Sequence, residues 1–221
     1  MTQFTDLSQN PHYGQPVQTS GEPLGRARAA MLMVHGRGAR AEDILTLAGP
    51  LALPGFTFLA PQAAGNTWYP NRFLEPVEQN EPWLSSALGR LGDLLEQIRR
   101  NGVPYERTIL LGFSQGACLA LEFAARNARR YGGIAGLSGA LIGAPDAPRQ
   151  DSGALAGTPV FLGCSEDDFH VPKERVDQTA ILLRKLGGVV TKRLYPGLGH
   201  TTNDDEIAAV RAMMQKALAA I

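Results

Sequence analysis

The segment 108–130 constrains the fold of this chain more than any other. An apolar run ends at Gly112, a serine stands between two glycines, and a proline-free stretch with helical spacing begins at Gln115. Gly112 and Gly116 would let a strand and a helix pack closely around a strained Ser114 and lift its hydroxyl clear of the sheet. We therefore predict a strand, a sharp turn and a helix, with Ser114 as a nucleophile. The alternative is an ordinary surface serine that two glycines flank.

Strands and helices alternate along the rest of the chain. Continuous apolar runs of strand length are predicted to be strands buried on both faces, and the stretches between them have helical spacing. The predicted strands are 29–34, 56–60, 108–111, 132–137, 158–163 and 189–195, and the predicted helices are 41–53, 83–100, 115–130, 173–186 and 203–221. This alternation predicts an α/β fold with a mostly parallel central sheet and helices on both faces.

Residues 1–28 are the least informative part of the sequence, although 13–20 alternates weakly, as an edge strand would. No linker-like stretch divides the chain, so we expect a single domain overall, with an N-terminal segment at 1–28 and the catalytic domain at 29–221. The irregular segment 62–82 is long for a compact domain, and such segments are typically lids or binding loops.

Charge and hydropathy exclude several classes of partner. Lys plus Arg and Asp plus Glu both number 21, so a formal net charge of zero argues against nucleic acid. No run approaches the roughly 18 to 20 apolar residues of a membrane span, and the polar start lacks a signal-peptide pattern. Cys118 and Cys164 are predicted to be buried thiols. We expect a cytoplasmic protein without stable membrane insertion, and a homodimer is left open.

A serine hydroxyl needs a base and an orienting carboxylate, and in this type of fold they follow in the order serine, acid, histidine. Only His170 and His200 come after Ser114. His200 is the preferred base, because it follows the last predicted strand in a glycine-flanked loop that can bring the imidazole over the strand ends. His170 is the second candidate. His35 precedes the serine and is predicted to shape its own loop by packing and hydrogen bonding.

The acid is predicted in the run 164–172, between a strand and a helix. Glu166, Asp167 and Asp168 compete there, and periodicity does not choose between them. Those that are not catalytic would lie in solvent or cap the helix.

Two backbone N–H groups must stabilise the oxyanion of an acyl transfer, one after the nucleophile and one in an earlier loop. The pattern predicts these donors at Gln115 and Arg37. The loop 35–38 lacks the third glycine of a dinucleotide fingerprint, which argues against a nucleotide site.

Five segments in this order resemble the phospholipase/carboxylesterase family of α/β-hydrolases, which includes acyl-protein thioesterases. The segments are His35-Gly36-Arg37-Gly38, Gly112-Phe113-Ser114-Gln115-Gly116, Leu137-Ser138-Gly139, Asp168 with Val171-Pro172, and Tyr195-Pro196-Gly197-Leu198-Gly199-His200. The resemblance runs from about Ala29 to the C-terminus. It implies the α/β-hydrolase fold and hydrolysis of carboxylic esters or thioesters of small to medium acyl chains through an acyl-enzyme, without a cofactor or metal. Counted back from Val171-Pro172, it also implies Asp168 as the orienting acid.

The same resemblance places Trp68 and Tyr69 beside the acyl pocket, as substrate-binding candidates. Their aromatic rings could equally fill the core under a long loop. Two positions depart from the family pattern: Phe169 stands where proline is frequent, and Arg37 stands where an apolar side chain is frequent. The Arg37 side chain has two interpretations, contact with an acidic substrate group or exposure to water.

Two other functions remain open. A lactonase similar to dienelactone hydrolase would share the architecture and favour a cyclic substrate with a carboxylate, and Arg37 is the residue that favours this alternative. A catalytically silent hydrolase fold that serves as a binding module is the other alternative, although serine, acid and histidine are all present in the expected order.

Overall fold

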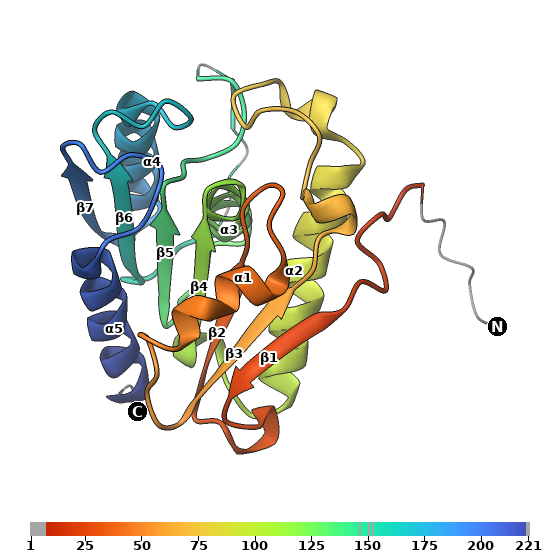
Figure 1. Ribbon diagram of the computed structural model, residues 1–221, viewed down its shortest axis with the longest axis vertical. Helices are drawn as coiled ribbons and strands as arrows, with labels where there is room; N and C mark the ends of the chain where they lie inside the picture. The colour runs from red at the N-terminus through yellow and green to blue at the C-terminus, as the bar shows by residue number, and fades with distance from the viewer. Residues whose placement is uncertain (1–7, 146, 150, 152, 220–221) are drawn as a thin grey trace.

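The computed structural model describes residues 8–145, 147–149, 151 and 153–219. Seven strands form one sheet in the order β1-β3-β2-β4-β5-β6-β7 (Figure 1). Their bounds are Val17–Gly21 for β1, Ala29–Val34 for β2, Phe56–Pro61 for β3, Thr108–Phe113 for β4, Gly133–Leu137 for β5, Pro159–Ser165 for β6 and Val189–Tyr195 for β7. β1 pairs antiparallel with β3, and the pairs that join β2 to β7 across the sheet are parallel. The predicted mostly parallel α/β sheet is confirmed.

Helices cover both faces of this sheet (Figure 1). They are α1 at Ala41–Leu45, α2 at Trp83–Arg100, α3 at Gln115–Arg126, α4 at Lys173–Lys185 and α5 at Asp204–Ala219. Residues of α2, α3 and α4 belong to one buried cluster, and residues of α1 and α5 belong to the other. β2 supplies alternate side chains to both clusters, Leu32 to the first and Met31 to the second. Burial on both faces explains why this strand reads as a continuous apolar run.

Some elements are shorter than the sequence pattern predicts. The helix expected over 41–53 is α-helical only to Leu45, and a 3-10 turn at Thr46–Ala48 continues it up to Gly49-Pro50. α3 ends at Arg126 instead of residue 130. At this end the side chain of Asn127 donates to the carbonyl of Phe123. Helical spacing therefore extends beyond the residues whose backbone groups find intrahelical partners.

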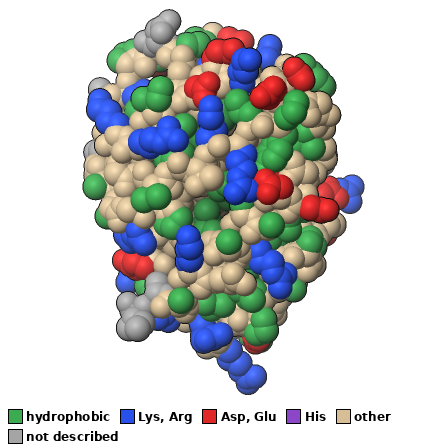
Figure 2. All heavy atoms as spheres, turned by 90° about the vertical axis from the view of Figure 1, so that its left-hand side faces the viewer, with side chains coloured by type: hydrophobic (Ala, Val, Ile, Leu, Met, Phe, Trp, Pro, Cys, Tyr) green, Lys and Arg blue, Asp and Glu red, His purple; other side chains and the backbone are tan. Residues whose placement is uncertain are grey.

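The N-terminal edge strand lies at Val17–Gly21, slightly later than the weak alternation at 13–20 suggests, and it forms one edge of the sheet. β7 forms the other edge. Figure 2 views the molecule from the β7 side, where Lys and Arg side chains are interspersed with Asp and Glu. On β7, Lys192 pairs with Asp177 and Arg193 pairs with Asp205. Charged side chains at a sheet edge disfavour pairing with the edge of another sheet.

The loops that carry the candidate residues follow the carboxyl ends of four parallel strands. β2 precedes the loop of His35, β4 precedes Ser114, β6 precedes Asp168 and β7 precedes His200. In open α/β sheets ligands bind beyond these strand ends. Among the helices of the described residues, none is both long and apolar enough to cross a membrane.

Candidate active site

Ser114 occupies a strained turn between β4 and α3, with φ 55° and ψ −122°. A Cβ atom at Gly112 would lie 2.2 Å from the carbonyl oxygen of Gly116, and a Cβ atom at Gly116 would lie 2.1 Å from that of Val34. Only glycine fits at either position. Strain of this kind is stored at functional sites, where the surrounding structure holds it. The turn thus has the geometry that the glycine-flanked serine predicts.

Three candidate side chains meet at this turn. The Nε2 atom of His200 lies 2.8 Å from the Oγ atom of Ser114, and its Nδ1 atom lies 2.7 Å from the Oδ2 atom of Asp168. The residues are up to 86 positions apart in the chain. The imidazole packs 5.2 Å from the ring of Phe113, measured between ring centroids. This arrangement can pass a proton from the serine hydroxyl to the imidazole while the carboxylate holds the ring.

Asp168 is the only one of the three competing carboxylates in the 164–172 run that is buried, whereas Glu166 and Asp167 are exposed. Its Oδ1 atom accepts backbone N–H bonds from His170 at 2.8 Å and Val171 at 3.1 Å. The Cys164 thiol lies 3.7 Å from Oδ2, and burial raises the pKa of that thiol to about 12. The thiol therefore stays protonated and can donate to the carboxylate.

A cavity of about 810 Å³ opens beside Ser114 and His200. Apolar side chains that line it include Tyr69, Phe73, Phe113 and Val171. His170 also lines it, with its ring centroid 4.6 Å from that of His200 in an edge-on arrangement. The second histidine candidate is thus a neighbour of the imidazole that contacts Ser114. The cavity has the size and the partly apolar lining of a small-molecule site.

Trp68 and Tyr69 separate in the structure. Tyr69 lines the cavity, whereas Trp68 is fully buried, does not line the cavity, and donates its Nε1–H to the carbonyl of His35. The expectation that Trp68 borders the acyl pocket is therefore corrected, because its ring packs in the core between His12 and His35. The segment is irregular, so periodicity could not predict which of the two rings lines the cavity and which packs in the core.

His12 and His35 are fully buried behind the cavity wall. The ring of His35 bonds the carbonyl of Gly36 and accepts the N–H of Ala63, and the ring of His12 bonds the carbonyl of Trp68. Burial lowers the pKa of both rings, so they are neutral at pH 7. His35 shapes its loop as predicted from the sequence. Nothing in the pattern of residues 1–28 singles out His12.

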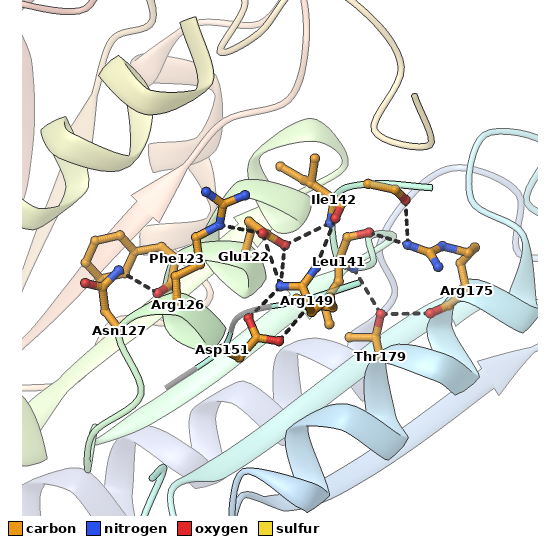
Figure 3. Close-up of polar contacts among 11 residues, drawn as sticks. Glu122, Phe123, Arg126, Asn127, Leu141, Ile142, Arg149, Asp151, Arg175 and Thr179 are labelled. Atoms are coloured by element: carbon orange, nitrogen blue, oxygen red, sulfur yellow. Dashed lines mark hydrogen bonds and ion pairs between the residues drawn. The ribbon is translucent and has the colours of Figure 1, made fainter. Parts of the chain in front are cut away.

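A second cavity, of about 590 Å³, lies beside a cluster of charged side chains on α3 and the 141–151 segment (Figure 3). Glu122 is buried and pairs with Arg126 and Arg149, and Arg149 also pairs with Asp151. Asp151 therefore lies in this cluster, away from the Ser114 turn. In the described part of the chain, no group of three or more acidic, histidine or cysteine side chains is placed to hold a metal ion.

Comparisons with known proteins identify relatives over most of the chain. The phospholipase/carboxylesterase family matches residues 19–218. Acyl-protein thioesterase 1 of Gibberella zeae is 36% identical over 135 residues, which are 57% of this chain and 54% of that protein. Acyl-protein thioesterase 1 of Debaryomyces hansenii is 34% identical over 114 residues, 51% of this chain and 49% of that protein. The match spans about half the length of these curated relatives.

Solved structures match over a larger share of the chain. A phospholipase/carboxylesterase from Dyadobacter fermentans has a TM-score of 0.88 and 42% identity, and the match covers 91% of this chain and 97% of that one. The esterase PE8 has a TM-score of 0.73 and 26% identity, with coverage of 92% and 98%. The chain therefore belongs to the phospholipase/carboxylesterase family, a family of hydrolytic enzymes with the α/β-hydrolase fold.

Proposed function

We propose that this protein hydrolyses carboxylic esters or thioesters of small to medium acyl chains through an acyl-enzyme on Ser114. The observation that carries the proposal is the pair of short contacts that His200 makes, 2.8 Å to Ser114 and 2.7 Å to Asp168, at the edge of a cavity. Membership of the family supports the reaction class.

In the proposed acylation step, the Nε2 atom of His200 takes the proton of Ser114 as the oxygen attacks the substrate carbonyl. Asp168 accepts the Nδ1–H bond and stabilises the imidazolium that forms. The imidazolium then gives its proton to the departing alcohol or thiol, which leaves the acyl group on the serine. Water attacks this ester in the second half of the cycle, with His200 as the base again, and the carboxylic acid leaves.

The negative oxygen of each tetrahedral intermediate would bind the backbone N–H groups of Arg37 and Gln115. Both residues line the cavity beside Ser114. Gln115 is also the first residue of α3, a 12-residue helix whose N-terminus favours negative charge. Loss of one such donor costs about 3 to 4 kcal/mol of transition-state stabilisation.

The contacts of Arg37 weaken the lactonase alternative. Both terminal nitrogens of its guanidinium donate to backbone carbonyls of residues 69–71, so its charge is already engaged by the protein. These bonds use three of its five N–H donors, which leaves fewer for an acidic substrate group. The reaction is expected in the cytoplasm, and the two free buried thiols, Cys118 and Cys164, suit such a reducing compartment.

Intact mass after treatment with a fluorophosphonate tests the proposal, with a Ser114→Ala variant as the control. The expected result is a single adduct on the parent protein and none on the variant. Hydrolysis of p-nitrophenyl esters, acyl thioesters and charged lactones would then rank the substrate classes. A folded parent protein that forms no adduct would rule out the nucleophile, and the binding-module alternative would take its place.

A further inference from the structure

The Arg37 guanidinium bridges three consecutive backbone carbonyls of the cavity wall. Its Nη1 atom donates to the oxygen of Pro70 at 2.7 Å, and its Nη2 atom donates to those of Tyr69 at 3.0 Å and Asn71 at 2.6 Å. The guanidinium also lies 5.9 Å from the centroid of the Tyr69 ring. Hydrogen bonds from a charged donor are shorter and stronger than neutral ones, and the planar fork holds several acceptors at once. Arg37 is an exposed residue, so its guanidinium contacts water and at the same time holds these three carbonyls.

Gln115 holds the same segment from the other end. Its Oε1 atom accepts the N–H of Trp68 at 2.9 Å, and its Nε2 atom donates to the Tyr69 carbonyl at 2.8 Å. The Tyr69 carbonyl thus accepts bonds from both Arg37 and Gln115. These are the two residues whose backbone N–H groups are the oxyanion donors of the proposed mechanism. Through their side chains, the oxyanion site and the cavity wall form one connected unit.

The clamped segment determines the shape of the cavity. Tyr69, Pro70 and Asn71 all line it, together with Phe113 and Val171 from other segments. Apart from the clamp, Asn71 is held by its N–H bond to the Asn80 side chain at 2.8 Å and by its own side-chain bond to Gln79. Without Arg37, the middle of the segment at Pro70 would lose its bond to the oxyanion loop.

We propose that Arg37 is a positioning residue that couples acyl-chain selectivity to oxyanion stabilisation, by fixing residues 69–71 against the loop that carries its own backbone N–H. This inference rests on the proposed function. Its signature is a joint effect: loss of the guanidinium widens the range of acyl chains accepted and also lowers kcat. A residue that only stabilised the fold would lower the melting temperature without changing the ratio of rates between chain lengths.

The experiment measures kcat and KM on p-nitrophenyl acetate, butyrate and octanoate for the parent, Arg37→Lys, Arg37→Met and Arg37→Ala. Arg40→Ala is the matched control, because Arg40 is an exposed arginine three residues along the same loop. For Arg37→Ala, kcat/KM on the preferred ester is expected to fall by about 10- to 100-fold, as for a displacement of about 1 Å at a reacting centre. Lysine should recover only part of the loss, because one ammonium cannot reproduce the fork.

Ethylguanidinium added to Arg37→Ala provides a second measurement, since it replaces the missing part of the side chain. It is expected to restore part of kcat and the original chain-length ratio in this variant, and to have no effect on the parent or Arg40→Ala. If Arg37→Ala fails to fold, Arg37→Lys and Arg37→Met give the same comparison. Rates and ratios in the folded Arg37 variants that match the parent within about twofold would overturn the inference.

The parent separates this failure from failure of the proposed function. If the parent forms the Ser114 adduct and hydrolyses esters while the Arg37 variants match it, only the positioning role is wrong. If the parent forms no adduct, the proposed function itself is wrong, and the coupling falls with it.

Discussion

Two buried carboxylates, Asp168 next to His200 at the candidate active site and Glu122 at the second cavity, have opposite kinds of hydrogen-bond partners. One oxygen of Asp168 accepts two backbone N–H bonds, and the other accepts a bond from His200, which in turn contacts Ser114. Both oxygens of Glu122 accept from Arg149, and they also accept from Arg126 and from the N–H of Ile142. The contacts of Asp168 lead through His200 to the Ser114 hydroxyl, which lines a cavity. The contacts of Glu122 lead only to arginine side chains and a backbone N–H of the protein.

This difference distinguishes a network suited to catalysis from one that stabilises the fold. In the proposed mechanism the reacting group needs one atom available to the substrate, and the Ser114 hydroxyl would supply it. A carboxylate whose bonds are all satisfied within the protein instead ties segments together, here α3 and the 141–151 segment (Figure 3). Substitutions in the first network should change rates, and substitutions in the second should change stability.

The largest effect is expected at Ser114. Ser114→Ala should lower kcat by about 10⁶-fold, because the nucleophile is lost, while the free energy of unfolding stays near that of the parent. Ester hydrolysis and urea unfolding measure the two quantities. Ser85→Ala, at an exposed serine of α2, is the control and should retain activity. A Ser114→Ala protein that hydrolyses esters like the parent would contradict the assignment.

Asp168→Asn should lower kcat by about 10⁴-fold, because an amide no longer favours the imidazole tautomer that accepts the serine proton. Asp167→Asn, at the exposed neighbour, should change kcat little. The pair of variants decides between adjacent carboxylates by steady-state kinetics. The opposite ranking would move the orienting role to Asp167.

Glu122→Gln should have the reverse signature. The neutral amide removes the buried charge that pairs with Arg126 and Arg149 and leaves Arg149 only its pair with Asp151, so the free energy of unfolding should fall by about 3 kcal/mol while kcat changes little. Chemical denaturation measures the loss, and Glu96→Gln, in an exposed pair with Arg99, is the control with a much smaller expected loss. A large loss of kcat with unchanged stability would contradict the purely structural role expected for Glu122.

Acidic pH is expected to destabilise the region around His12 and His35 more than the region around Glu122. His12 and His35 have lowered pKa values in the folded protein, chiefly because burial disfavours their charged forms. The unfolded chain therefore binds more protons below pH 6.5, and stability should decrease as the pH falls through and below this value. Hydrogen exchange at Ala63, which donates to His35, should rise at pH 5.5 relative to Ile142, which donates to Glu122. Equal changes at both amides would contradict the expectation.

The smallest effect concerns a third buried carboxyl, Glu206. It accepts the N–H of Asn203 in a capping box, and its Oε1 atom has no hydrogen-bond partner among the described residues. Burial raises its pKa to about 7, so stability should fall as the pH rises from about 4.5 to about 7. Glu206→Gln should remove this slope and stabilise the protein by about 1 kcal/mol at pH 8, measured by urea unfolding. If stability still fell with pH in the variant as it does in the parent, a group other than Glu206 would be responsible.

Local patterns predicted much of the fold and part of the site. α2 and β7 have the bounds that periodicity predicts, because each has flanking residues that stop the pattern. The roles of Ser114 and His200 remain proposals. Their proximity was predicted because each follows the end of a predicted strand and because serine, acid and histidine come in the expected order along the chain. Periodicity could not choose between Asp167 and Asp168, because the path of an irregular loop decides which carboxylate turns inward. The family resemblance, counted along the chain, indicated Asp168.

The sequence by itself determined the alternation of strands and helices and the glycines around Ser114, since these depend on sterics and periodicity over a few residues. Only the tertiary structure decided the partners of Arg37, the burial of Trp68 and the closed network of Glu122. Arg37 meets carbonyls 32 to 34 positions away, and Glu122 meets Arg149 27 positions away. Contacts between residues so far apart in the chain depend on the paths of the connecting loops, and local sequence patterns do not determine those paths.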